Sequence, residues 1–460
     1  MERLVILNGD VVTGDGKTVL KNTGVIVQDH TIVDLVPGQL ELAAPNGGKV
    51  IDATNKYVIP GIINHHAHGI SLGPLFSSCV NPLPQDQVLK NLNKHLLQGT
   101  TTILSLDGFA TVDEVQSIAR LHSILLRMAT SHTPWNFKAA EAGDGSGLKV
   151  VHRQTSAQEM IAAGAVAFGE IGSGATLGGG VQEYLYIPAA IKKKTGRELP
   201  ERQARALKTA VLGRYMQPSA YDPVQTARVL KENHLDDCLT PEETRDLVSA
   251  IVLPPISAAL QGLKEAGEMA KQFGIPLIVH NSAPSKEVIL EMAQRGLGRL
   301  LIAGHSNHTT FDLGEAVSFA RQLKEHGAVI DISTFGSFQA NDSEEMEMQF
   351  LMLREGVVET VSTDYGGGAH DPMLVVLEKA IARHCLDLPT AIALVTNNVA
   401  HAVPLLAPNR GIVAEGKEAD LAIIDKEHIS QVDTVIIGGR IAVEHGQLAK
   451  VLGEEAMGKH

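Results

Sequence analysis

The sequence predicts an α/β protein: a (β/α)8 TIM-like barrel with a small β-sandwich domain built from both chain termini. Three observations support this fold class. The chain has 460 residues, a length that suits one large barrel of about 250 residues or more plus an accessory domain. Short Val- and Ile-rich runs at both ends are typical of antiparallel strands. Between these ends, short apolar runs alternate with segments of helical periodicity, as in a parallel sheet wrapped by helices.

The two ends of the chain share one pattern. Runs such as RLVILNG and GVIVQD are separated by Gly, Asp and Asn near the start, and similar runs return in ADLAIID and VDTVIIGG near the end. We therefore expect residues 1–57 and 407–455 to form one composite β domain, and residues 58–406 to form the barrel. Two separate β caps are the alternative.

Eight apolar runs are candidates for the barrel strands. Apolar residues at helical spacing separate them, for example in residues 86–97, 112–128, 257–273 and 372–385. Eight parallel strands with intervening helices can close into a barrel. The candidate strands are residues 58–66, 100–106, 148–152, 165–170, 276–280, 300–305, 328–333 and 358–364.

Residues 174–253 are too long for an ordinary connection, because connections beyond about 15 residues usually carry their own structure or a function. We interpret them as an insertion in the barrel. The insertion contains a basic helical stretch, IKKKTGRELPERQARALKTAVLGRY. A solvated helix face is one interpretation of this stretch. A lid or an oligomer contact beside the barrel opening is the other.

Charge and composition exclude several classes of protein. The net charge of −13 argues against a nucleic-acid partner, which requires a concentrated positive surface. No apolar run approaches the roughly 20 residues that span a bilayer, and the charged start of the chain does not resemble a signal sequence, so we expect a cytoplasmic protein and no membrane partner. Cys79, Cys238 and Cys385 are far apart and odd in number, which argues against a disulfide framework and indicates buried or reduced thiols.

The run VIPGIINHHAHG ends in two histidines separated by one residue, His66 and His68. Along a strand, residues i and i+2 point to the same side, so both imidazoles can reach one metal ion. Two histidines on a polar turn are the alternative. A short motif of this kind cannot separate the two alone.

Further metal-capable side chains follow at the predicted strand ends: Glu170, His280, His305 and Asp364. In barrels of this type the chemistry lies at the carboxyl ends of the strands. Four imidazoles and two carboxylates suit zinc, iron or manganese better than calcium or magnesium, and they are enough for two ions. The carboxylate of Glu170 can bridge two ions, and the ion pair can share a nucleophilic hydroxide.

Several motifs together resemble the amidohydrolase superfamily. They are the segment from Pro60 and Gly61 through Asn64 to His66 and His68, the stretch LLQGTTTIL, the later histidines, STD ending in Asp364, and the closing GIVAEGKEADLAIID. Most binuclear members carry a carboxylated lysine on strand four, whereas AFGEIGSG offers Glu170 there. In this respect the chain is similar to the enamidase branch and to adenine deaminases.

The resemblance implies a role for each site residue. His66 and His68 would bind one ion, Glu170 would bridge, and His280 and His305 would bind the second ion. Asp364 would touch the first ion and act as general base. The implied function is hydrolysis of a C–N bond in a cyclic, non-peptide amide, as in enamidases, by a metal-bridging hydroxide. The implied cofactors are two divalent ions, zinc with iron or manganese as alternatives, and the implied state is a homo-oligomer, a tetramer or dimer.

Two departures keep other functions open. Asn64 stands where the family usually has Asp, and the insertion weakens transfer of substrate specificity from enamidases. A deaminase or an N-acyl amino acid deacylase of the same superfamily, a metal-dependent lyase, and a non-catalytic barrel scaffold are the alternatives.

Four further polar residues near the predicted strand ends are candidates for contact with a small-molecule substrate. His152 would close the third strand, although a hydrogen-bonded strand-end histidine is the alternative. Asn307 and His308 follow His305, and His370 follows Asp364.

Overall fold

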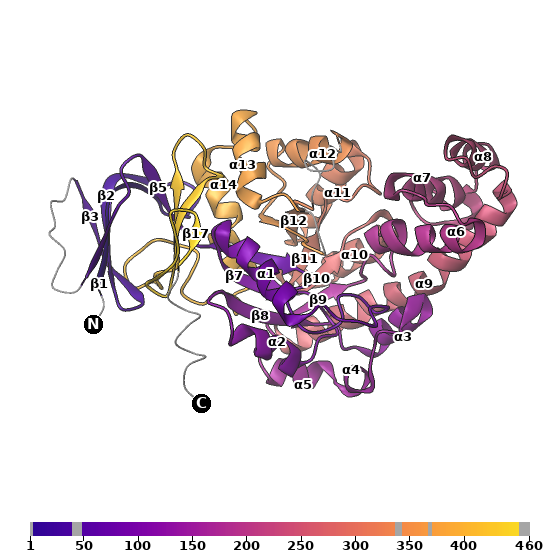
Figure 1. Cartoon of the computed structure of the whole chain (residues 1–460), viewed down its shortest axis with the longest axis horizontal. Helices are drawn as coiled ribbons and strands as arrows, with labels where there is room; N and C mark the ends of the chain where they lie inside the picture. The colour runs from indigo at the N-terminus through magenta and orange to yellow at the C-terminus, as the bar shows by residue number, and fades with distance from the viewer. Residues whose placement is uncertain (1–2, 39–47, 336–342, 367–369, 450–460) are drawn as a thin grey trace.

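The computed structural model describes residues 3–38, 48–335, 343–366 and 370–449. Two sheets organise these residues, one of nine strands and one of eight. Figure 1 shows the nine-stranded sheet at one end of the molecule, the eight-stranded sheet in the middle, and three helices at the far end. These three helices are α6 (Ile187–Thr195), α7 (Glu201–Leu212) and α8 (Pro223–Glu232).

The eight-stranded sheet is the predicted barrel. Its strands are parallel and neighbour one another in chain order from β6 to β13. The barrel closes between its first and last strands, where Ala67 pairs with Tyr365 and the Asp364 N–H donates to the His66 carbonyl at 3.0 Å. The strands are β6 (Ile62–Ala67), β7 (Thr100–Ser105), β8 (Leu125–Thr130), β9 (Ala167–Ile171), β10 (Leu277–His280), β11 (Leu301–Gly304), β12 (Val329–Ser333) and β13 (Thr360–Ser362).

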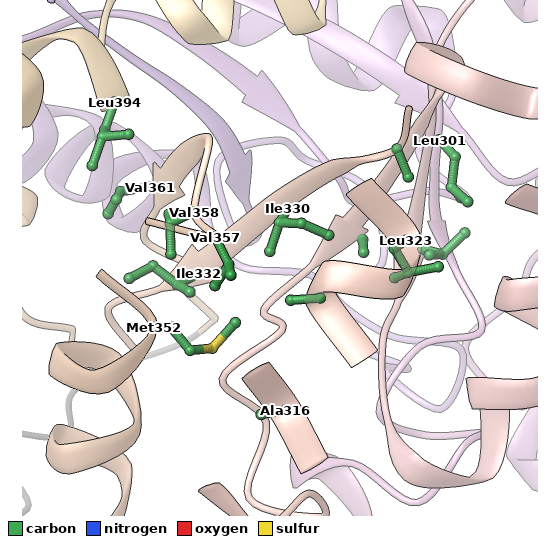
Figure 2. Close-up of a cluster of buried hydrophobic side chains, with 14 of the residues drawn as sticks. Leu301, Ala316, Leu323, Ile330, Ile332, Met352, Val357, Val358, Val361 and Leu394 are labelled. Carbon is green, nitrogen blue, oxygen red and sulfur yellow. The ribbon is translucent and has the colours of Figure 1, made fainter. Parts of the chain in front are cut away.

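Helices cover the barrel and bury apolar side chains against it. Figure 2 shows part of this core, where Ile330 and Ile332 of β12 lie among Leu323, Met352 and other buried side chains of the neighbouring helices. The remaining helices are α1 (Gln85–Leu97), α2 (Val112–Ala119), α3 (Pro134–Asp144), α4 (Val150–Gln154), α5 (Ala157–Ala162), α9 (Pro241–Phe273), α10 (Lys286–Met292), α11 (Leu313–Glu325), α12 (Ser343–Arg354), α13 (Met373–Ala382), α14 (Leu388–Leu394) and α15 (Asn397–Ala402).

The third strand was predicted at the wrong place. Residues 148–152 do not form a strand, because residues 150–154 form α4, whose Val150 and Val151 are 67% and 52% exposed. The true third strand is β8, which begins at Leu125 within the helix predicted over residues 112–128 and continues beyond it; the observed helix, α2, ends at Ala119. Apolar runs this short do not distinguish strand from helix by periodicity alone.

The first predicted strand, residues 58–66, divides at Gly61. The residues before Gly61 pair with the chain ends, and the residues after it enter the barrel. A Cβ at Gly61 would lie 2.2 Å from the Thr101 hydroxyl oxygen, so only glycine fits where the chain passes from one sheet to the other.

The nine-stranded sheet takes strands from both chain ends, and the predicted fold class is confirmed. The N-terminal part pairs with the C-terminal part through β5 and β14, which run antiparallel. The domain boundaries stay a prediction, and residues 450–455 of the predicted domain lie outside the described residues. The strands are β1 (Arg3–Val12), β2 (Val19–Gln28), β3 (Thr31–Pro37), β4 (Lys49–Asp52), β5 (Lys56–Pro60), β14 (Leu421–Asp425), β15 (Val432–Ile437), β16 (Arg440–Glu444) and β17 (Gln447–Leu448).

The predicted insertion is helical and has an apolar core of its own. This core includes Ile191, Leu207, Val211 and Val248 from α6, α7 and α9. Within the described part of the chain, α9 is the one helix that is long and apolar enough to cross a membrane by length and composition. Its apolar character matches its packing against α3, β9 and β10.

Candidate metal centre

The six predicted ligands converge at the carboxyl ends of the barrel strands. They form two groups, His66 with His68 and Asp364, and Glu170 with His280 and His305. Within each group the potential ligand atoms all lie within 4.8 Å of one another. The parallel strand order explains the convergence, because all strands present their carboxyl ends at one side of the barrel.

Glu170 lies between the two groups. Its Oε1 is 2.9 Å from His280 Nδ1 and 2.8 Å from His305 Nε2. Its Oε2 is 3.8 Å from His68 Nε2. Because its two oxygens face different histidines, this carboxylate is placed to contact ions in both groups.

Asp364 lies on the other side of the first group. Its Oδ1 is 3.3 Å from His66 Nε2 and 3.5 Å from His68 Nε2. Both Asp364 and His305 have left-handed backbones, with φ of 46° and 35°, a conformation that is uncommon outside glycine. Such strain is often found at functional sites.

The electrostatics of the cluster keep its carboxylates ionised. Burial opposes ionisation of Glu170, but His280 and His305 outweigh it and hold its pKa well below the usual range. Burial likewise opposes ionisation of Asp364, and His66 and His68 hold its pKa far below the usual range. Burial also disfavours protonation of His305, yet the two carboxylates raise its pKa to about 9.

The cluster has the donor set of a metal site. Both nitrogens of His66, Nε2 of His280 and Nδ1 of His305 are buried and have no hydrogen-bond partner among the described residues. Buried polar atoms are normally paired, so unpaired imidazole nitrogens in a cluster that also holds two ionised carboxylates call for a cation. Imidazole and carboxylate together suit divalent transition ions. The residues therefore fit divalent metal ions.

Asp107 supports the site and was not singled out from the sequence. It follows β7 and accepts hydrogen bonds from the Gly69 N–H at 2.9 Å and the Ser71 hydroxyl at 2.6 Å. Its Oδ1 lies 3.7 Å from His68 Nδ1. Burial opposes protonation of His68, but Asp107 and Asp364 together hold its pKa well above the usual 6.5. The available signal was its position, because Asp107 ends a strand as the predicted ligands do.

A cavity lies over these six side chains, which we call the metal-type cluster. Its lining includes an apolar wall, formed by Leu75, Phe76, Leu106 and Phe109 from the loops after β6 and β7. The insertion contributes Glu183, Tyr184 and Arg205 to the lining. The insertion therefore borders the cavity, as a lid or an oligomer contact beside the barrel opening would, while Lys192, Lys193 and Lys194 of its basic run are exposed to solvent.

Buried charges join two segments of the insertion to each other beside the cavity. Lys208 is 1% exposed and lies 2.5 Å from Glu183 Oε1, and Arg205 Nε lies 2.7 Å from Glu183 Oε2. The part of the basic stretch that faces inward is thus paired rather than solvated.

The structure separates the four candidate substrate contacts. Asn307 and His308 line the cavity, whereas His152 and His370 are not among the described residues that do so. Asn307 donates to the Ser333 carbonyl at 3.0 Å and accepts from the Ser333 N–H at 2.9 Å, which ties two strand ends together.

His152 was wrongly placed at a strand end. It is fully buried on α4, where Nδ1 accepts the Lys149 N–H at 3.0 Å and Nε2 bonds to Glu114 Oε1 at 3.1 Å. His370 is buried too, with Nε2 2.8 Å from Gln98 Oε1 and its ring against His95. Neither position supports contact with a substrate.

Comparisons with known proteins agree with this geometry. No family model matches the chain. An imidazolonepropionase from Geobacillus sp. (strain WCH70) is 24% identical, covering 96% of this chain and 92% of its own. Among solved structures, β-aspartyl dipeptidase from Fervidobacterium islandicum AW-1 aligns with a TM-score of 0.60 at 12% identity, and the alignment covers 98% of this chain and 99% of that chain. A D-hydantoinase (dihydropyrimidinase) from Thermus sp. aligns with a TM-score of 0.55 at 18% identity, and the alignment covers 99% of this chain and 98% of that chain. These structures share the fold with the chain.

Proposed function

The chain belongs to the amidohydrolase superfamily, and from this premise we propose that it is a metal-dependent hydrolase that opens a cyclic amide. Proteins similar to it are hydrolases acting on C–N bonds. The imidazolonepropionase and the D-hydantoinase are named for ring compounds, whereas the β-aspartyl dipeptidase is named for a dipeptide. Restriction to non-peptide rings, as in an enamidase, is therefore part of the proposal.

The position of Glu170 carries the proposal. One carboxylate faces both His68 and the pair His280 and His305, which is the arrangement expected of a bridging ligand. We propose that His66, His68 and Asp364 hold one divalent ion and that His280 and His305 hold a second. Zinc is the first choice, and iron or manganese is the alternative. When bound, such ions acidify water and polarise a carbonyl oxygen.

Asp364 is the proposed general base. Its carboxylate is held ionised by His66 and His68, lines the cavity, and is therefore ready to accept a proton from the attacking water. The same carboxyl group then returns the proton to the leaving nitrogen, which cannot depart as an amide anion. In a cyclic substrate both products of this cleavage stay in one molecule.

Product analysis tests the proposal. Protein loaded with zinc, iron or manganese is incubated with cyclic amides and imides, N-acyl amino acids and aminopurines, and products are followed by NMR and an ammonia assay. We expect a new carboxylate in one ring-opened product without release of ammonia. Ammonia would instead indicate a deaminase, and a free acid with an amino acid would indicate a deacylase. Less than one bound ion per chain, with no turnover, would indicate a scaffold.

Assembly and location are also proposals. We propose a homo-oligomer, a tetramer or dimer, acting in the cytoplasm on a small molecule. Light scattering coupled to size-exclusion chromatography measures the assembly, and a monomeric mass would contradict it.

A further inference from the structure

His308 lies in the cavity wall beside the metal-type cluster. It follows β11 by four residues, and its ring centroid is 5.2 Å from that of His280 and 5.5 Å from that of His305. It lines the cavity but is not a member of either ligand group. Its chemistry is therefore available for a purpose other than holding an ion.

The neighbours of His308 fix which ring nitrogen carries the proton. The Thr310 N–H points at His308 Nδ1 at 3.1 Å, and a backbone N–H can only donate. Nδ1 must therefore be an acceptor, which excludes both the imidazolium and the Nδ1–H tautomer. The Thr310 hydroxyl lies 2.9 Å from the same nitrogen and itself accepts from the Ala283 N–H, so its own proton is free to point at Nδ1.

The proton of His308 consequently lies on Nε2. Among the described residues, this nitrogen has no hydrogen-bond partner. The result is an oriented N–H donor at the wall of the cavity. A donor of this kind favours a ligand that brings an acceptor and disfavours one that leaves the donor unpaired.

The position of His308 in the barrel adds a second constraint. β11, which precedes His308, and β7, which precedes Leu106 and Phe109, are separated by three strands in either direction around the barrel. The strand ends that lead to His308 and to Phe109 therefore lie on opposite sides of the barrel, and both residues line the cavity. The Phe109 ring is supported from behind by Phe137, with centroids 5.0 Å apart.

We propose that His308 determines specificity by donating from Nε2 to an acceptor of the substrate, while an apolar substituent of the same substrate packs against Phe76 and Phe109. This inference rests on the proposed function, since it assumes that the reacting carbonyl lies over the metal-type cluster. It names the substrate class more closely. A cyclic imide with an apolar substituent has a second carbonyl to accept from His308, whereas a simple lactam has none.

A matched pair of ligands tests the inference by binding rather than turnover. The pair is 3-phenylsuccinimide, with two ring carbonyls, and 4-phenylpyrrolidin-2-one, with one. Calorimetry on the zinc-loaded Asp364→Asn protein, which should retain metal but turn the ligands over slowly, should show about tenfold tighter binding of the imide, the usual effect of one hydrogen bond. This protein is the reference, and the His308 substitutions are made in it. In His308→Leu this ratio should fall to about one, and in His308→Gln, which retains an N–H donor, it should largely return.

Two controls separate the possible failures. Phe109→Ala should weaken both ligands and leave their ratio unchanged, and metal content and thermal unfolding establish that each variant is folded and loaded. A ratio that is the same in His308→Leu as in the reference protein, or a reference protein that does not distinguish the ligands, overturns the inference even if the wild type opens rings. Absence of ring opening with an intact, His308-dependent ratio overturns the proposed function alone.

Discussion

Replacing Asp107 by Asn tests whether this residue orients a metal ligand. The carboxylate lies 3.7 Å from His68 Nδ1, the nitrogen that faces away from Asp364. In the wild type the Gly69 N–H donates to Asp107 Oδ1 at 2.9 Å. Asn is nearly isosteric with Asp and keeps an oxygen that can accept this hydrogen bond. The exchange therefore removes the negative charge beside His68 and leaves the loop largely in place.

The size of the effect follows from what such a neighbour does. A carboxylate beside a ligating histidine fixes the ring orientation and raises its basicity, and its loss costs about 10- to 100-fold in metal affinity. This corresponds to about 1.4–2.7 kcal/mol. Because Asp107 is not itself in either ligand group, we expect weaker binding rather than loss of the site.

Competition for zinc against a chromogenic chelator measures the affinity. The matched control is Asp10→Asn. Asp10 is buried like Asp107, with 7% of its surface exposed, but it lies in the nine-stranded sheet. Zinc affinity of Asp107→Asn within twofold of wild type, in protein that unfolds at the same temperature, would refute the orienting role.

Four further predictions follow from the same geometry. Asp364→Asn should retain metal and lower kcat by about 10²- to 10⁴-fold, as expected for loss of a general base; near-normal turnover would remove that assignment. Glu170→Ala should lower the bound ions per chain from two to one or fewer by elemental analysis, and an unchanged count would show that Glu170 does not bridge. Lys208→Met should lower the free energy of unfolding in urea by about 3–5 kcal/mol, because it leaves buried Glu183 without its nearest cation. Adding Glu183→Leu should recover part of this stability. Hydrogen bonds from two lysines and a backbone amide outweigh burial and lower the pKa of Asp10 from 3.8 to about 2. The contribution of Asp10 to folding stability is therefore complete above about pH 4 and is lost as the pH falls toward 2. The melting temperatures of wild type and Asp10→Asn should converge over that interval, and a constant difference would contradict this.

The convergence of the six candidate ligands could be predicted because each position depends on little beyond strand order. A residue at the carboxyl end of a parallel strand reaches the same side of the barrel whatever the helices between the strands do. His280 and Glu170 were found in this way, although 109 residues and the whole insertion separate them. The angle of each ring and the position of Glu170 between the two groups required the structure.

The third strand could not be predicted because two short segments carried misleading signals. LKVVH has the paired β-branched residues of a strand, yet Val150 and Val151 are exposed and α4 buries His152 instead. LLRMAT continues an apolar pattern from α2 and so resembled the end of a longer helix. Which segment enters the barrel depends on packing against β7 and β9, information that neither segment carries alone.

The departure at Asn64 is explained by its partner across the barrel closure. Asn64 Nδ2 donates to the Thr363 hydroxyl at 2.7 Å, while Oδ1 accepts from the Thr363 N–H and the His66 N–H, both at 3.3 Å. The Thr363 hydroxyl in turn lies 3.2 Å from the His66 carbonyl, to which it donates. An ionised Asp accepts hydrogen bonds but cannot donate them. It therefore could not donate to the Thr363 hydroxyl oxygen while that hydroxyl donates to the His66 carbonyl. Asn therefore suits a barrel closure in which Thr363 precedes Asp364, and the departure changes the support beneath the first ligand group rather than the ligands.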